Sequence, residues 1–233
     1  MVRMIISSIV IMLLGLAQVS AHDAWFEPND GKFVILYGHG EELESYDISK
    51  IKEVKAHDGQ GNGTVLDVKK REDGKAVVAP PDNTVMLTMV FDNGFWVKTE
   101  EGWKNVSKRN VGSYLESCHS MKFAKHIIDW SPVLTNAVGL KMEIVPLKNP
   151  MSLKTGEVLQ VKVLLDGKPV EGVTVATGGG HKSGMTTNNA GIVDVLIEKP
   201  GFQFISASYR VPLRNNPDAD ELLLSSNLTF YVE

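Results

Sequence analysis

Two histidines near the start of the chain have the residue type and the spacing for a metal site. Removal of an apolar leader after Ala21 would leave His22 with both a free α-amine and an imidazole, two nitrogen donors that can close one chelate ring. Asp30-Gly31 is a strong signal for a two-residue hairpin turn, and pairing outward from it sets His22 opposite His39. Directly opposed residues have Cβ atoms about 5 Å apart, so both imidazoles can converge on one ion.

The pairing register decides whether this site can form. A slip of one residue would send the two side chains to opposite faces of the sheet. Pro28 permits the pairing only in a strand at a sheet edge. In any other register, His22 is an incidental residue of a loose terminus and His39 is a loop residue bonded to backbone.

Three further histidines are secondary candidates for the metal site. His119 follows Cys118, which would add a soft sulfur donor, and His126 lies in the same segment. His181 lies in a glycine-rich loop, residues 178–184, that could fold over a ligand. Isolated His and Cys side chains are more often structural, and a plain surface loop is the simpler interpretation of 178–184.

Residues 1–21 have the layout of a secretory signal peptide. Arg3 precedes an apolar run over 4–16, and Val19-Ser20-Ala21 is a small-residue cleavage site. The run is shorter than the roughly 20 residues of a spanning helix. We therefore expect cleavage after Ala21, a periplasmic mature protein and no membrane span once the leader is removed.

Composition predicts a globular protein. The 233 residues are 43% hydrophobic and 22% charged, which is close to the globular average. The net charge is −4 and no basic block is present, so nucleic acid is not an expected partner. Cys118 is the only cysteine, so no disulfide can form within the chain.

Short apolar or alternating runs predict strands throughout the first half. Turn signals separate them at the spacing of an all-β sandwich: Asp58-Gly59, Asp73-Gly74, Pro80-Pro81-Asp82-Asn83 and Asp92-Asn93-Gly94. Residues 111–130 are the exception, because they fit either helical turns or a strand with its lysines exposed.

Two prolines, Pro146 and Pro150, favour an extended linker between two regions. Residues 22–147 are predicted to form an N-terminal β-rich, metal-binding domain. About seven strands over 148–233 predict an immunoglobulin-like sandwich. The expected fold is thus all-β, with two β-sandwich domains.

Several stretches of the mature chain resemble a family of secreted bacterial proteins associated with nickel and cobalt uptake, often labelled a domain of unknown function. The stretches that carry the resemblance are His22-Asp23-Ala24-Trp25-Phe26-Glu27-Pro28, Tyr37-Gly38-His39-Gly40-Glu41, Lys122-Phe123-Ala124-Lys125, Glu143-Ile144-Val145-Pro146-Leu147 and Asp166-Gly167-Lys168-Pro169. The resemblance also implies a C-terminal sandwich of the immunoglobulin-like or carboxypeptidase-regulatory-like kind. This chain has Asn188 where the family tends to have Asp, a departure expected to affect a turn.

The resemblance implies a periplasmic component that captures Ni²⁺ or Co²⁺ and presents the ion to a membrane transporter. It carries over His22 and His39 as ligands, whereas His119, His126 and His181 have no comparable motif match. Nitrogen donors alone do not select the metal, because Cu²⁺ binds most such sites more tightly and Zn²⁺ also binds them.

Enzyme signatures are mostly absent, since the chain has no His-Glu-x-x-His zinc motif, nucleophile elbow or phosphate-binding glycine loop. We therefore expect a binding protein. Two alternatives stay open. One is an adhesive or scaffolding module without metal. The other is a copper oxidase of polysaccharide, in which an amino-terminal histidine holds the metal and Trp25, Trp96 and Trp103 stack on sugar.

Overall fold

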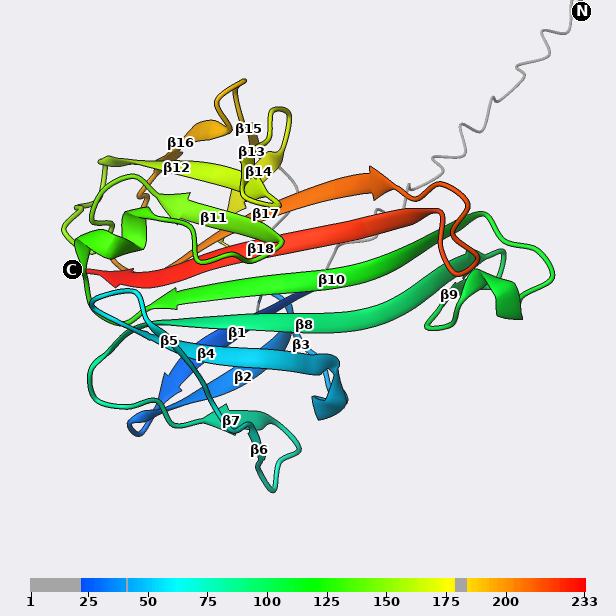
Figure 1. Cartoon of the computed structure of the whole chain (residues 1–233), viewed down its shortest axis with the longest axis horizontal. Coiled ribbons are helices and arrows are strands. Elements are labelled where there is room, and N and C mark those ends of the chain that lie inside the picture. Colours follow the sequence, from blue (N-terminus) through cyan, green and yellow to red (C-terminus); the bar gives the residue numbers. More distant parts are fainter. Residues whose placement is uncertain (1–21, 41, 179–183) are drawn as a thin grey trace, which may run out of the picture.

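The computed structural model describes residues 22–40, 42–178 and 184–233, and the regular secondary structure in these residues is almost entirely β-strand (Figure 1). In these residues the strands form three sheets, with nine, five and four members. We call them the central, N-terminal and outer sheets. The predicted all-β fold, with sheets packed face to face, is confirmed.

The central sheet contains the longest strands of the molecule. Its order is β15 (Met185–Thr186), β14 (Thr174–Thr177), β17 (Gly201–Pro212), β18 (Glu221–Val232), β10 (Glu116–Ile127), β8 (Thr84–Thr99), β4 (Ile51–Asp58) and β5 (Gly63–Val65), with β9 (Gly102–Lys104) also paired to β8. Strands β10 and β18 are parallel, and the other neighbours in this sheet are antiparallel.

The two smaller sheets are built from shorter strands. The N-terminal sheet has the order β1 (Asp23–Asn29), β2 (Lys32–His39), β7 (Ala76–Val78) and β6 (Lys69–Lys70), with β3 (Glu42–Leu43) also on β2. The outer sheet contains β11 (Met142–Pro146), β12 (Val158–Leu165), β13 (Lys168–Pro169) and β16 (Ile192–Leu196).

Within the part of the chain that the structure describes, three short 3₁₀ helices lie in the connections: η1 (Ile48–Lys50), η2 (Lys108–Asn110) and η3 (Pro132–Thr135). Across the described ranges, no helix combines the length and the apolar character needed to cross a membrane.

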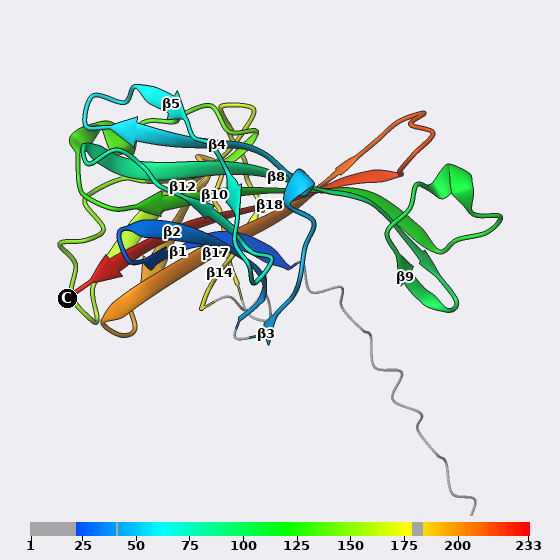
Figure 2. The same cartoon turned by 90° about the horizontal axis from the view of Figure 1, so that it is seen from below.

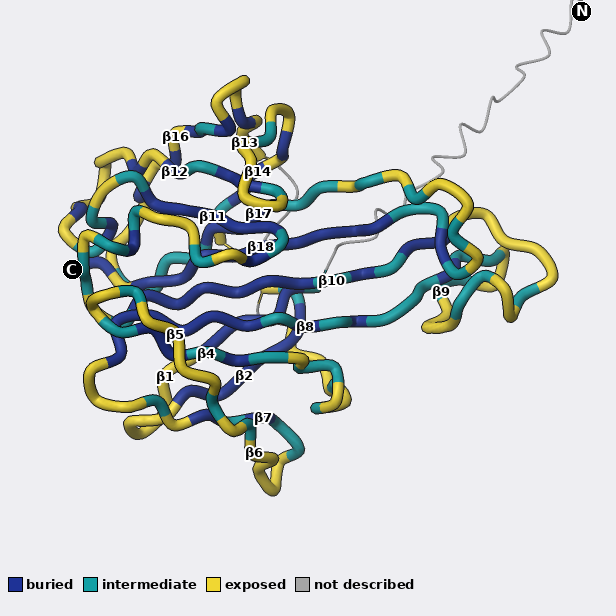
Figure 3. The backbone as a smooth tube through the Cα atoms, in the orientation of Figure 1, coloured by how far each residue is buried: buried dark blue, intermediate teal, exposed yellow. Residues whose placement is uncertain are grey.

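The central sheet has a packed layer on each face. Side chains alternate along β8, so Leu87 and Met89 join the core shared with the N-terminal sheet, while Met86 joins the core shared with the outer sheet. On β10, Ala124 joins the core shared with the N-terminal sheet, and Phe123 joins the core shared with the outer sheet. Figure 3 shows the result, with the middle of β10 and β18 coloured as buried over several residues in succession.

The predicted boundary after residue 147 does not separate the sheets. Strand β11 precedes the boundary, yet it pairs with β12 beyond it. Strand β10 likewise pairs with β18, which is the last strand of the chain. The two regions therefore share hydrogen-bonded strands, and their division into two domains stays a prediction.

The ambiguous segment 111–130 contains a long strand, β10. The expectation that a strand here would expose its lysines is wrong, because Lys122 and Lys125 are both at most 2% exposed. Lys122 and Lys125 are three residues apart, so they lie on opposite faces of the strand. The sheet is covered on both faces, and each lysine is therefore buried on its own side of the sheet.

The predicted turn at Asp92-Asn93-Gly94 is a β-bulge within the continuous strand β8. The register between β8 and β10 shifts between Ser120 and Met121, opposite this point, and Gly94 has a φ of +81°. One extra residue on β8 is accommodated without reversing the chain. The bulge places Asn93 in the interior, where it is 5% exposed.

A buried ion pair joins the central sheet to the outer sheet. Lys125 of β10 and Glu143 of β11 form a salt bridge, and each side chain is only 1% exposed. The Glu143 carboxylate also accepts hydrogen bonds from the backbone N–H groups of Val138, at 2.8 Å, and Gly139, at 3.1 Å. Burial lowers the pKa of the Lys125 ammonium, and the carboxylate opposes that shift.

Glu143→Gln should destabilise the fold strongly, because it leaves the Lys125 ammonium buried without a counter-charge. Loss of one partner of a buried pair costs about 3–5 kcal/mol. We expect a loss of that size in urea unfolding at neutral pH. The double variant Lys125→Met, Glu143→Gln should recover part of it, and a double variant no more stable than Glu143→Gln would contradict this role.

Candidate metal site at the amino terminus

The β1–β2 hairpin has the register predicted from the sequence. Asp30 and Gly31 both have positive φ, 49° and 71°, as a tight two-residue hairpin turn requires. Residues then pair without interruption from Asn29 with Lys32 to Asp23 with Gly38. The next positions outward on the two strands are His22 and His39. Strand β1 lies at the edge of its sheet, which satisfies the condition that Pro28 imposes.

The His22 side chain is held by two contacts. Its ring stacks on the ring of Tyr37, with centroids 5.4 Å apart and an interplanar angle of 25°. Its Nε2 lies 2.8 Å from Oε1 of Glu44. Strand alternation puts Tyr37 and His39 on one face of β2. The ring of His22 therefore lies on the face from which His39 projects.

The Tyr37 ring, on which His22 stacks, is itself held by contacts with the central sheet. The ring stacks on Phe91 of β8, with centroids 5.4 Å apart, and the Tyr37 hydroxyl accepts a hydrogen bond of 3.1 Å from Nδ2 of Asn93. Lys50 in turn donates to Oδ1 of Asn93 at 2.8 Å. Burial raises the pKa of Tyr37 to about 12, so the phenol stays neutral. The bulge in β8 thus helps to fix the ring on which His22 lies.

A tight reversal after β2 brings Glu44 to His22. The backbone N–H of Glu44 donates to the carbonyl of Tyr37 at 2.9 Å. Gly38 has a φ of +158°, and a Cβ there would lie 2.1 Å from the carbonyl oxygen of Glu42. Only glycine allows the returning chain to approach this closely.

A buried lysine, Lys122, lies near the Tyr37 ring. The ammonium of Lys122 lies 5.9 Å from the centroid of the Tyr37 ring, and the side chain is 2% exposed. Burial lowers the pKa of Lys122 to about 8, while the negative charge of Asp23 opposes the shift. The ammonium thus interacts with the Tyr37 ring and, electrostatically, with the carboxylate of Asp23 at the start of β1.

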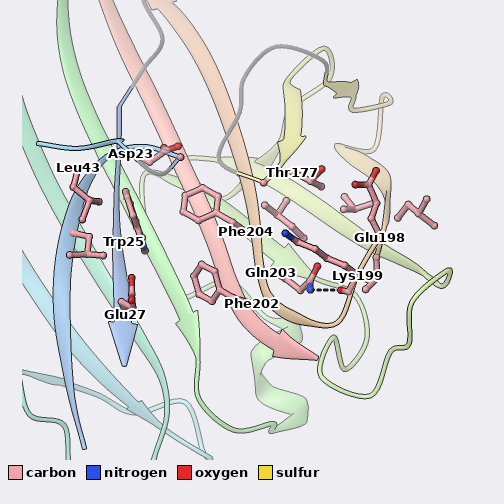
Figure 4. Close-up of a pocket in the computed structure, with 17 residues that line it drawn as sticks. Asp23, Trp25, Glu27, Leu43, Thr177, Glu198, Lys199, Phe202, Gln203 and Phe204 are labelled. Atoms are coloured by element: carbon pink, nitrogen blue, oxygen red, sulfur yellow. Dashed lines mark hydrogen bonds between the residues drawn. The ribbon is translucent and has the colours of Figure 1, made fainter. Parts of the chain in front are cut away.

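The opposite face of β1 lines a pocket of about 580 Å³ (Figure 4). Trp25 forms one wall and meets Phe204 of β17 edge to face, with ring centroids 5.6 Å apart. Phe202 lies beside Phe204, and Figure 4 shows both rings turned toward β1. Asp23 lines the same pocket, so the pocket begins one residue from His22. The sequence contains no local signal for it, because its walls come from opposite ends of the chain.

The other predicted donors lie in separate surroundings. His119 Nε2 is 2.8 Å from Oδ1 of Asp92, and its ring packs on Phe95. His126 is 2% exposed, and its Nδ1 hydrogen-bonds to the hydroxyl of Thr229 at 2.9 Å. These two histidines are seven residues apart on β10, or about 23 Å at strand geometry, so they cannot share an ion.

Two further observations bear on the donor set. His181 lies outside the described residues. Among those that the structure does describe, no three His, Cys, Asp or Glu side chains are grouped closely enough to hold a metal ion. The arrangement at His22 and His39 differs from such a group, because its additional donor would be the α-amine that cleavage creates.

These features define an all-β protein in which two smaller sheets cover a long central sheet and a hairpin carries a histidine at its open end. Residues 19–211 match the family described as a domain of unknown function, DUF4198, and the chain belongs to that family. It is also similar to a protein of Haemophilus influenzae described as uncharacterized. The two are 31% identical over 221 residues, which cover 94% of this chain and 93% of that protein.

Stability should fall with acid because of His126. Burial lowers the pKa of His126 to about 4 from its ordinary value of 6.5. Between these values the unfolded chain binds a proton that the folded chain does not, so stability decreases as the pH falls from about 6.5 to about 4. The loss is of the order of 3 kcal/mol at most.

Urea unfolding at pH 7 and at pH 4.5 tests this, with His126→Gln as the comparison. The variant should lose less stability between the two pH values than the native protein does. Equal losses in the two proteins would show that His126 does not contribute to the acid sensitivity.

Proposed function

We propose that this protein is a periplasmic binding protein for Ni²⁺ or Co²⁺ that captures the ion and delivers it to a membrane uptake system. The observation that carries the proposal is the β1–β2 register, which runs to the Asp23–Gly38 pair and leaves His22 and His39 as the next positions on the two strands. The resemblance to secreted nickel and cobalt uptake components supports the choice of metals.

The donor set suits a borderline transition metal. The α-amine and imidazole of His22, together with the imidazole of His39, supply nitrogen ligands of the kind that Ni²⁺, Co²⁺, Cu²⁺ and Zn²⁺ accept. Such ligands must be unprotonated to bind, so ion binding releases protons and weakens in acid. The site is at the open end of the hairpin, and His22 is about one-third exposed, so an ion can enter and leave without unfolding.

Export forms part of the proposal because the α-amine exists only after cleavage. A leader removed after Ala21 would deliver the protein to the periplasm with the chelating residue at its amino terminus. The ion is then cargo, and no step of catalysis is required of the site.

One added residue before His22 should abolish tight binding. We expect the protein beginning at His22 to bind Ni²⁺ or Co²⁺ tightly in calorimetry at neutral pH. A version with one extra Gly before His22 should not, because the added residue moves the α-amine away from the imidazole. Equal binding by the two forms, or binding by neither, would refute an amino-terminal site.

His39→Ala should weaken Ni²⁺ binding more than the 10–100-fold typical of losing a residue that only supports a ligand. The reason is that the substitution removes a direct nitrogen donor. His119→Ala is the matched control, since His119 is paired with Asp92 on β8. Loss of binding in the control but not in His39→Ala would contradict the assignment.

A further inference from the structure

We propose that Glu44 is a positioning residue that holds the His22 imidazole in the tautomer with Nδ1 free for the metal. This inference rests on the proposed function, and it concerns how the site is preorganised. The contact that carries it is the 2.8 Å approach of His22 Nε2 to Oε1 of Glu44.

The chemistry of the contact assigns the proton on the ring. An ionised carboxylate has no hydrogen to donate, so the hydrogen bond requires N–H at Nε2 of His22. In a neutral imidazole the other nitrogen, Nδ1, then has a free lone pair. Nδ1 is also the nitrogen that can close a chelate ring with the α-amine of the same residue, through Cα, Cβ and Cγ. Nε2 lies on the far side of the ring and cannot close it.

The ring plane is fixed as well as the tautomer. Stacking on Tyr37 restricts the tilt of the His22 ring, while Glu44 restricts its rotation about the bond to Cβ. Glu44 is itself anchored, since its backbone N–H donates to the Tyr37 carbonyl at 2.9 Å. Tyr37 thus supports both restraints. Its ring stacks on His22, and its backbone carbonyl holds Glu44.

This arrangement has a consequence for the ion. Glu44 interacts with the nitrogen that faces away from the chelate, so its carboxylate is a support and is not a ligand. Ligand histidines in metal sites commonly donate their second N–H to a carboxylate in this way. The remaining donors are nitrogens, which favour Ni²⁺ or Cu²⁺ over Mg²⁺ or Ca²⁺, ions that prefer oxygen.

Three variants of the protein beginning at His22 test the inference. Glu44→Ala removes the hydrogen-bond acceptor, and Glu44→Gln keeps an acceptor oxygen without the charge. Glu171→Ala is the control, because Glu171 is an exposed acidic residue and its loss changes the net charge equally. Glu44 is more than half exposed, so its replacement should leave the fold intact.

Calorimetry with Ni²⁺ measures the effect on affinity. We expect Glu44→Ala to bind 10–100-fold more weakly than the native protein. Glu44→Gln should bind with intermediate affinity, and Glu171→Ala should bind like the native protein. Native affinity in Glu44→Ala, with tight binding by the native protein, would overturn the role of Glu44 while leaving metal capture in place. Equal losses in Glu44→Ala and Glu44→Gln would instead indicate that the charged carboxylate is itself a ligand.

Nitrogen-15 spectra of the metal-free protein, with labelled histidine, measure the tautomer directly. The native protein should carry the His22 proton on Nε2 with Nδ1 unprotonated, and Glu44→Ala should show a mixture of both tautomers. A mixture in the native protein would overturn the inference. This readout needs no metal, so it separates failure of the Glu44 assignment from failure of the proposed function.

Discussion

Coverage of the central sheet on both faces is the constraint on which the rest of the structure depends. Most residues of β10 and β18 are buried, so polar residues on these strands need partners inside the protein. Lys125 forms a salt bridge with Glu143, His126 forms a hydrogen bond with Thr229, and Lys122 lies over the Tyr37 ring. The same burial lowers the pKa of each of these three bases. The interior is thus sensitive both to loss of a partner and to pH.

The candidate site depends on this sheet through Tyr37. Figure 2 shows the N-terminal sheet against the central sheet, and the contacts with Phe91 and Asn93 make that packing specific at Tyr37. The His22 ring stacks on the same Tyr37 ring. Contacts that lead into the core therefore hold His22, which lies at the open end of the hairpin. Trp25, on the other face of β1, lines the adjoining pocket.

The part of the site that the sequence predicted is local. Asp30-Gly31 sets a tight turn, and a two-residue turn leaves one register for the strands that follow it. The pairing from Asn29 with Lys32 to Asp23 with Gly38 is the expected one. The contact between Glu44 and His22 could not be predicted in this way. Several acidic residues follow Gly40, and the sequence does not indicate which of them returns to β1. The close approach of the returning chain to Gly38 brings Glu44 to His22.

By itself, the sequence determined the all-β class, the β1–β2 hairpin and the pairing that leads to His22 and His39. These features follow from the residues that favour tight turns and from the alternation of side chains between the two faces of a strand. Both depend only on residues close together in the sequence. Tertiary structure alone decided that β10 is buried with its lysines, that Asp92-Asn93-Gly94 bulges instead of turning, and that the two halves share a sheet. Each of these depends on what covers a strand, and the covering residues lie far away in the chain.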